Sequence, residues 1–339
     1  MKRFIRFTML ALCMAAPAFA QDTSVNVNWY TIPELPSVPI IDGDLSDPVW
    51  ANVPTIPMDK NGDSPAAVPG SGDLDIILKI AWDDETNALY FAVNVIDDSL
   101  TLAQGLGSTA GTGGWNNERL EVVLDGTNTG DAASTTTSGF HQQYTFDMPN
   151  TWDPYDPAAG LYGLFNVESP NALKVTTQFT QVPVYERVEG SLNLNNSHAP
   201  WNIADEYIES AARIRATNPA SREWIEAPVE YNWEVKIVPF EFLVGASTLG
   251  YDLANPANIA SGWKSYWEDP THDKLDLKQG IVIGCSPQQN DADIWGQTPA
   301  REHQTNTTGV AGNWNSSESL TGLILGPRVS TSVADWSIQ

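Results

Sequence analysis

The chain has 339 residues, with 42 Asp and Glu against 17 Lys and Arg, and a formal net charge of −25. Nucleic acid and anionic lipid are poor partners for such a chain, because phosphate binding depends on clustered Lys and Arg side chains. It also has 13 Trp, more of these large, polar-tipped rings than a core alone usually needs, so we expect some to contact a ligand.

The first 20 residues have the pattern of a secretory signal peptide. Three basic residues precede an apolar run over positions 7–16, and Ala18-Phe19-Ala20 forms a cleavage site of the usual kind. The apolar run is too short to span a membrane. We therefore expect cleavage after Ala20, a secreted or periplasmic product with no membrane insertion, and a mature chain of residues 21–339.

Cleavage would leave Cys285 as the one cysteine, so we expect no disulfide within the mature chain. Cys285 follows the apolar residues 281–283, which favours a small buried side chain over a reactive thiol.

After the cleavage site, Asp42-Gly43-Asp44 marks a tight turn, and Trp50 is expected to anchor a short helical turn against a sheet. For the carboxylates here, turn capping is the favoured role over metal binding. Residues 74–83 alternate between apolar and polar side chains, the acidic stretch 83–87 forms a turn, and alternation resumes over residues 89–95. This pattern predicts a β-hairpin.

A Gly/Thr/Ser-rich loop over residues 99–114 leads to Trp115 and then to an alternating strand. Leu120, Val122 and Leu124 share one face of that strand, so Glu121 and its polar neighbours Arg119 and Asp125 point to the other. Residues 140–148 alternate in the same way, with Gln143 and Thr145 on the polar face. If the two strands pair, these polar side chains share one surface.

Residues 149–205 are less regular and are interpreted as an inserted elaboration of a single domain, since they lack a core pattern of their own. Strands are expected again near residues 206–216, 231–237, 281–285 and 320–325, and no segment has the pattern of a long amphipathic helix. The fold predicted for residues 21–339 is therefore all-β, an antiparallel β-sandwich or jelly roll.

Several separated pieces together resemble carbohydrate-binding module family 9, with its DOMON-like sandwich. The resemblance covers roughly residues 40–325, and its order and spacing are more specific than any single piece. The pieces are Ile41-Asp42-Gly43-Asp44-Leu45-Ser46-Asp47-Pro48-Val49-Trp50, Ile80-Ala81-Trp82-Asp83-Asp84, Leu89-Tyr90-Phe91-Ala92-Val93, residues 115–125, Trp233-Glu234-Val235-Lys236-Ile237, Val282-Ile283-Gly284 with Asn290-Asp291-Ala292-Asp293, and Trp314 ahead of Gly322-Leu323-Ile324-Leu325.

The resemblance implies a carbohydrate partner, held with its terminal sugar between two Trp side chains, here Trp115 and Trp314. It implies polar contacts from Glu121 on the intervening strand, and Gln143, Thr145 and Asn290 are the further candidates for binding sugar hydroxyls. Thr145 stands where family members can carry an Arg. Structural calcium is also known in the family, with no catalytic cofactor. For Trp50, Trp82 and Trp233 the expected role is packing, whereas Trp201, Trp263, Trp267 and Trp295 stay undecided.

Other functions are open at this stage. An enzyme is disfavoured, because no acid stands beside a nucleophile and the four His show no metal or triad spacing, although such modules are often attached to glycoside hydrolases of carbohydrate catabolism. A haem-binding electron carrier could use Met58, Met148, His141 or His198, without any Cys-x-x-Cys-His motif. No repeat or anchor supports a purely structural surface protein.

Overall fold

The computed structural model describes residues 26–62, 74–101, 119–130, 141–147, 166–169, 172–175, 178–181, 206–215, 224–243, 264–291, 303–310 and 319–329. In these ranges helix is limited to the 3-10 turn η2 (Pro48–Trp50) and to α2 (Lys264–Trp267). No helix among them is long and apolar enough to cross a membrane. The expected all-β class is confirmed.

The strands are β1 (Asn26–Glu34), β2 (Thr55–Ile56), β3 (Lys60–Asn61), β4 (Leu74–Asp83), β5 (Ala88–Thr101), β6 (Arg119–Asp125), β7 (His141–Asp147), β8 (Asn166–Ser169), β9 (Ala172–Val175), β10 (Gln178–Gln181), β11 (Ile208–Arg215), β12 (Trp224–Ile237), β13 (Phe240–Phe242), β14 (Asp273–Lys274), β15 (Val282–Asp291), β16 (His303–Asn306) and β17 (Leu320–Arg328).

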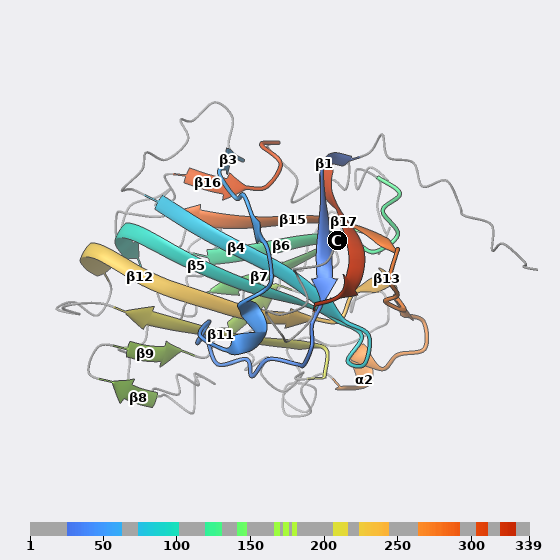
Figure 1. Cartoon of the computed structure of the whole chain (residues 1–339), viewed down its shortest axis with the longest axis horizontal. Helices are drawn as coiled ribbons and strands as arrows, with labels where there is room; N and C mark the ends of the chain where they lie inside the picture. Colours follow the sequence, from blue (N-terminus) through green and yellow to red (C-terminus); the bar gives the residue numbers. More distant parts are fainter. Residues whose placement is uncertain are drawn as a thin grey trace, which may run out of the picture.

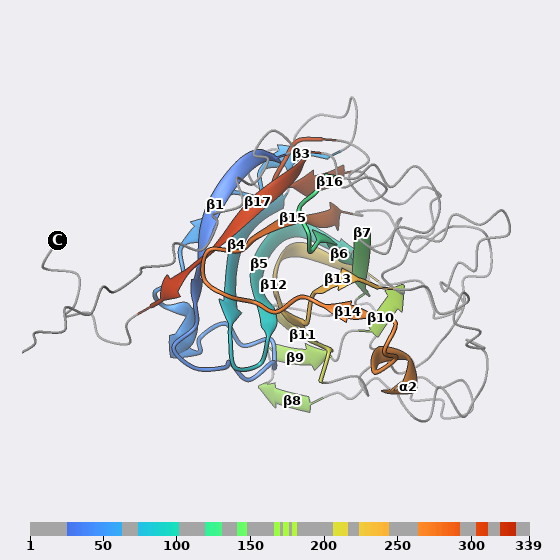
Figure 2. The ribbon, with the colours of Figure 1, turned by 90° about the vertical axis from the view of Figure 1, so that its right-hand side faces the viewer.

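Most of these strands belong to one sheet in the order β10-β7-β6-β15-β17-β1-β4-β5-β12-β11-β9-β8, while β16 pairs with β15. The sheet curls over on itself, so that β4, β5, β12 and β11 form one layer in front of a second layer that contains β15, β6 and β7 (Figure 1). The curl is visible from the side in Figure 2. The predicted two-layer β-sandwich is therefore confirmed.

Strand β1 connects the two layers, and it was not expected from the sequence. It pairs in parallel with both β17 and β4, whereas the other described strand pairs are antiparallel. Its Trp29 lies opposite Gly322 of β17. A Cβ atom at Gly322 would come within 2.6 Å of the Trp29 ring, so glycine is what allows this ring to lie flat against the neighbouring strand.

The hydrophobic core fills the space between the two layers. Leu120, Val122 and Leu124 enter it from one layer, and Val93 and Tyr231 enter it from the other. Burial of large apolar side chains of this kind is the main favourable contribution to folding.

Three Trp side chains expected to pack, Trp50, Trp82 and Trp233, are buried, which confirms that expectation. Trp267, undecided from the sequence, is buried as well and stacks on Tyr207. Cys285 is fully buried, and burial raises the pKa of its thiol, so the expectation of an unreactive packing residue is confirmed.

The predicted β4–β5 hairpin is present, and its turn is held by Asn87. This residue has a positive φ of 54°. Its side-chain amide donates to the Leu275 carbonyl at 2.7 Å, and its Oδ1 accepts the Leu277 N–H at 2.8 Å. The hairpin turn is thereby tied to the segment that precedes β15.

We expect Asn87→Gly to lower the free energy of unfolding by about 1–2 kcal/mol, because both tying hydrogen bonds are lost. Asn87→Ala should cost about 1 kcal/mol more, since alanine is also strained at positive φ. Urea denaturation of the two variants measures the difference. Equal stabilities would show that the backbone conformation does not constrain this position.

Strands from the stretch 149–205 join both ends of the sheet. Strand β10 pairs with β7, while β9 pairs with β11 and carries β8 at the outer edge. The interpretation of this stretch as an elaboration of one domain stays a prediction. The expected signal peptide, residues 1–20, lies outside the described residues.

The acidic turn before η2 is built from three successive side-chain caps. Asp42 accepts the N–H of Asp44, Asp44 accepts that of Ser46, and Asp47 accepts that of Val49 at the start of η2. The expected capping role is confirmed. Among the described residues, no group of three or more His, Cys, Asp or Glu side chains is placed to hold a metal ion.

Candidate binding site

Strand β6 has two faces of different chemistry, as the alternation of its residues predicted. Leu120, Val122 and Leu124 lie in the core between the layers. Glu121 therefore points to the outer face, together with Arg119 and Asp125. Yet Glu121 is only 2% exposed and Arg119 only 3%. Charged side chains are rarely buried so fully unless they are paired, so this face is organised rather than simply solvated.

The neighbouring strands bring further polar side chains to the same outer face. Glu121 lies opposite Thr145 of β7 on one side and opposite Gln288 of β15 on the other. Asn290 of β15 lies opposite Gln304 of β16. Residues directly opposite each other in a sheet project to the same face, so four strands contribute to one surface.

Hydrogen bonds connect these side chains into a network around the Glu121 carboxylate. Gln143 Nε2 donates to Glu121 Oε2 at 2.9 Å, and Asn290 Nδ2 donates to Glu121 Oε1 at 3.0 Å. Gln304 Nε2 in turn donates to Asn290 Oδ1 at 2.9 Å. Each carboxylate oxygen thus accepts a hydrogen bond from a side-chain amide.

Gln288 lies between these groups and differs from them in its bonding. Its side chain is 0% exposed, and within the described part of the chain neither its Nε2 nor its Oε1 forms a hydrogen bond. A buried amide without partners costs about 1–3 kcal/mol for each unmade bond, so natural proteins seldom keep one without a reason. An ordered water, or a bound ligand that reaches this amide, would supply the missing partners.

We call Glu121, Gln143, Gln288, Asn290 and Gln304 the outer polar cluster. The structure brings together three of the residues expected from the sequence, Glu121, Gln143 and Asn290. The backbone of Thr145 lies opposite Glu121. Trp115 and Trp314 lie outside the described residues, so their placement stays a prediction.

Gln288 and Gln304 were not expected from the sequence. The strand that contains Gln288 was predicted to end near Cys285, but β15 continues to Asp291 with all ten residues buried. Residues 286–291 are polar on both faces and include Pro287, so they show no alternation to reveal a strand. The available signal was their amide-rich composition next to Asn290.

The residues suggested for haem binding do not form a common site where they are described. Met58 lies in the hydrophobic core. His141 lies opposite Asp125 at the start of β7, on the outer face. The other two, Met148 and His198, lie outside the described residues.

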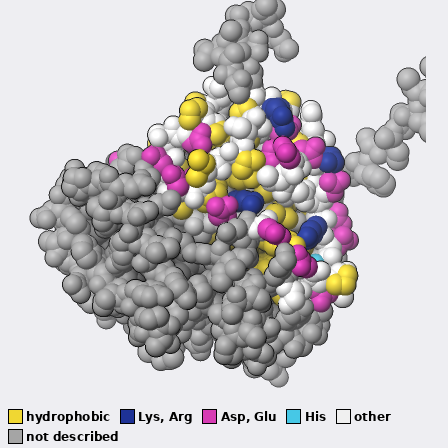
Figure 3. Space-filling model, turned by 90° about the horizontal axis from the view of Figure 1, so that it is seen from below, with side chains coloured by type: hydrophobic (Ala, Val, Ile, Leu, Met, Phe, Trp, Pro, Cys, Tyr) yellow, Lys and Arg dark blue, Asp and Glu magenta, His cyan; other side chains and the backbone are white. Residues whose placement is uncertain are grey.

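The charge of the described surface agrees with the acidic composition. On the face shown in Figure 3, Asp and Glu side chains are spread among apolar ones, and Lys and Arg side chains lie singly between them. A phosphate backbone requires clustered basic side chains, and the described part of this face shows none.

Comparison with known proteins gives one family match and several structural similarities. Similar solved structures include a carbohydrate binding module family 9 from Caldicellulosiruptor kristjanssonii in complex with cellotriose, with 15% identity, TM-score 0.45, and coverage of 92% of this chain and 100% of that chain. The same organism's module in complex with glucose gives 16% identity, TM-score 0.44 and coverage of 89% and 98%.

A putative carbohydrate-binding protein from Bacteroides uniformis gives 9% identity, TM-score 0.44, and coverage of 88% of this chain and 99% of that one. No match was found among curated proteins. The family match covers residues 41–196, which span the stretch from the capped acidic turn through β4, β5, β6 and β7. This part of the chain therefore matches the carbohydrate family 9 binding domain-like family model, in agreement with the resemblance found in the sequence.

Proposed function

We propose that this protein binds a carbohydrate at the outer polar cluster and does not transform it. The observation that carries the proposal is Gln288, a fully buried amide that lacks partners within the described chain beside the amide-bonded carboxylate of Glu121. The family match over residues 41–196 supports a sugar as the ligand.

The chemistry of the cluster suits sugar hydroxyl groups, which both donate and accept hydrogen bonds. The Gln288 amide offers two N–H donors and one carbonyl acceptor, and the Glu121 carboxylate has further lone pairs. Arg119 lies on the same face two residues before Glu121. A basic donor is thus present on this face, although Thr145 stands where family members can carry an Arg.

Apolar contacts complete the proposed mode of binding. A pyranose ring carries C–H patches on its two faces, and an indole covering one face contributes roughly 1–3 kcal/mol. Trp115 and Trp314 are proposed to cover the two faces of a terminal sugar or of a small oligosaccharide. Trp115 precedes β6 by four residues and Trp314 precedes β17 by six, and both strands belong to the layer that carries the cluster.

No catalytic step is part of the proposal. A glycosidase needs one carboxyl group that donates a proton and a second one that attacks or activates water. Glu121 instead has both oxygens occupied by amide donors, an arrangement that suits a fixed acceptor of ligand hydroxyls.

Export and structural calcium remain proposals that come from the sequence. Cleavage after Ala20 would deliver the protein to the periplasm or the exterior, where polysaccharides are met. The family resemblance also implies structural calcium, and among the described residues no group of three or more His, Cys, Asp or Glu side chains is placed to hold it.

The test is calorimetric titration with a panel of mono- and oligosaccharides. We expect Gln288→Leu to weaken sugar binding by at least about tenfold, the equivalent of about 1.4 kcal/mol. The same variant should be as stable as the wild type or more stable, because a buried amide without partners is replaced by an apolar side chain of similar size. Thermal melting without sugar measures this second effect.

The proposed apolar contacts with the sugar ring are tested by Trp115→Ala and Trp314→Ala. Each of these variants should reduce the affinity for sugar more than Gln288→Leu does. Undiminished binding in both Trp variants would contradict the Trp sandwich alone. Undiminished binding in Gln288→Leu, or no sugar binding by the wild type, would contradict the proposed function.

A further inference from the structure

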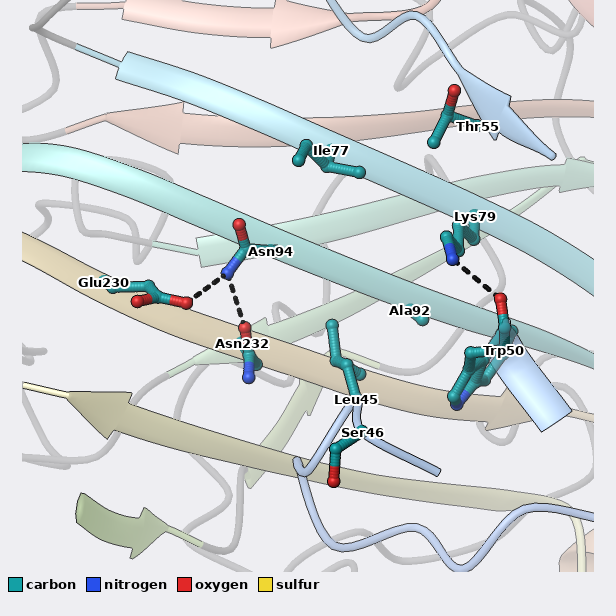
Figure 4. Close-up of a pocket in the computed structure, with 10 residues that line it drawn as sticks. All are labelled: Leu45, Ser46, Trp50, Thr55, Ile77, Lys79, Ala92, Asn94, Glu230 and Asn232. Atoms are coloured by element: carbon teal, nitrogen blue, oxygen red, sulfur yellow. Dashed lines mark hydrogen bonds between the residues drawn. The ribbon is translucent and has the colours of Figure 1, made fainter. Parts of the chain in front are cut away.

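A hollow lies over strands β4, β5 and β12, on the outer face of the sandwich opposite the outer polar cluster. Its volume is about 480 Å³, within the range usual for small-molecule sites. Figure 4 shows Ile77, Lys79, Ala92 and Asn94 on the strands, with Leu45 and Trp50 approaching from the segment that crosses over them. The hollow is lined by Leu45, Ser46, Trp50, Thr55, Ile77, Lys79, Ala92, Asn94, Glu230 and Asn232.

One wall of this hollow is the segment 42–50, which crosses over the strands, and a buried carboxylate holds this segment in place. Glu234 of β12 is 0% exposed. Its Oε2 accepts the backbone N–H groups of Asp42 and Gly43 at 3.0 and 3.1 Å, and its Oε1 accepts Trp50 Nε1–H at 2.8 Å. Three donors from one segment converge on one side chain, so the wall is pre-organised rather than a loosely lying loop.

The floor of the hollow has an apolar part that is partly open to solvent. Ala92 of β5 is buried, while Ile77, diagonally across from it on β4, is 50% exposed. Leu45 from the crossing segment faces the same space (Figure 4). A ligand that places C–H groups on this floor would remove exposed apolar surface from water.

The rim carries one acidic and one basic side chain, Glu230 and Lys79, and each of them has a hydrogen-bond partner within the protein. Asn94 Nδ2 donates to Glu230 Oε1 at 3.0 Å and to Asn232 Oδ1 at 2.8 Å. Lys79 Nζ donates to the Trp50 carbonyl at 2.7 Å, which leaves two N–H groups of this ammonium for other acceptors. One carboxylate and one ammonium leave no net charge, which favours a neutral ligand over an anion or a cation.

We infer that this hollow is a second site for a neutral sugar ring, with the choice of sugar as ligand resting on the proposed function. The C–H groups of the sugar ring would cover Ile77 and Ala92, while its hydroxyls would bond to Lys79 Nζ and to the side-chain oxygen Oδ1 of Asn94. The two sites lie on opposite outer faces of the sandwich, so one molecule would hold two separate glycan chains.

The experiment follows the side-chain NH2 signals of Asn and Gln in a two-dimensional nitrogen–proton NMR spectrum during titration with glucose and cellobiose. Asn94 and Asn232 report on the hollow, whereas Gln143, Gln288 and Gln304 report on the outer polar cluster. We expect both groups of signals to shift. The signals of the hollow should saturate at a higher sugar concentration than those of the outer polar cluster, because the Trp50 ring is buried and offers no face for a sugar to stack on.

Ser46→Trp is expected to abolish the shifts of Asn94 and Asn232 only, because the large ring would fill the hollow from its exposed rim. Ser37→Trp is the matched control, since Ser37 is also exposed and does not line the hollow. Its spectrum should respond to sugar as the wild type does.

The outcomes separate the two proposals. Shifts at the outer polar cluster alone would overturn the second site and leave the proposed function intact. Shifts at the hollow alone, removed by Ser46→Trp, would support the second site and contradict the proposed function at the cluster. Shifts at the hollow that persist in Ser46→Trp would also overturn the second site, and the absence of any shift would overturn both.

Discussion

Glu234→Ala is expected to lower the free energy of unfolding by about 3–5 kcal/mol at neutral pH, because three donors would lose their acceptor. These donors are the backbone N–H groups of Asp42 and Gly43 and the indole Nε1–H of Trp50. Trp50 is only 1% exposed and its N–H bonds to Glu234 alone, so this N–H would not be solvated in the folded variant. The variant also leaves a cavity beneath the segment that carries η2.

Glu230→Ala is the matched control for this prediction. Glu230 lies four residues earlier on β12, hence on the same face, but it is only partly buried, and the Asn94 amide donates to it. Its loss should cost no more than about 1 kcal/mol. Chemical denaturation of both variants measures the difference. A Glu234→Ala variant as stable as Glu230→Ala would show that the 41–50 segment is held by its apolar contacts alone.

Much of the sandwich could be predicted from the sequence because its strands have one apolar and one polar face. In β6, the alternation of Leu120, Val122 and Leu124 correctly identified the core-facing side. Trp50 was correctly expected to anchor a helical turn, since an Asp-Gly turn and Pro48 precede it. Strong local patterns thus determined both the strands and their faces.

Strand β1 and the end of β15 could not be predicted, because neither segment has one clearly apolar and one clearly polar face. The residues of β1 are only partly buried over most of the strand and are interrupted by Pro33, so their pattern is weak. The partner of β1 is β17, almost three hundred residues away in sequence. Only this long-range pairing makes the segment a strand, and no local pattern reports it.

The sequence predicted the carboxylate at the centre of the candidate site, but it did not predict all of the amide side chains around it. Glu121 is conspicuous as a carboxylate within an alternating strand, and Gln143 follows from the next one. Gln288 and Gln304 enter through the pairing of β15 with β6 and β16. The incomplete bonding of Gln288 is a property of the packed structure alone, so the amide-rich composition next to Asn290 was the one sequence signal for the residue that carries the proposed function.

The buried carboxylate of Glu234 also connects the fold to pH. Burial, with a smaller contribution from the nearby Asp42 carboxylate, raises the pKa of Glu234 from the ordinary value of 4.5 to about 7. The hydrogen bonds from Trp50, Asp42 and Gly43 act in the opposite direction, because they favour the charged form. Since burial outweighs these bonds, the folded protein holds a proton that the unfolded chain releases near pH 4.5.

The stability contributed by this proton is therefore fully present below about pH 4.5 and is lost as the pH rises through about 7. We expect the loss over this window to be on the order of 3 kcal/mol. Other carboxylates titrate in the same range, so the wild-type profile alone does not isolate Glu234.

Glu234→Gln isolates the effect, because glutamine has nearly the same shape and does not titrate. The stability of the wild type relative to Glu234→Gln should be greatest at pH 4.5. By pH 8 this relative stability should have fallen by up to about 3 kcal/mol. Urea denaturation at half-unit pH intervals measures this difference. A difference that stays constant with pH would mean that the three hydrogen bonds balance the effect of burial and leave the pKa of Glu234 at its ordinary value.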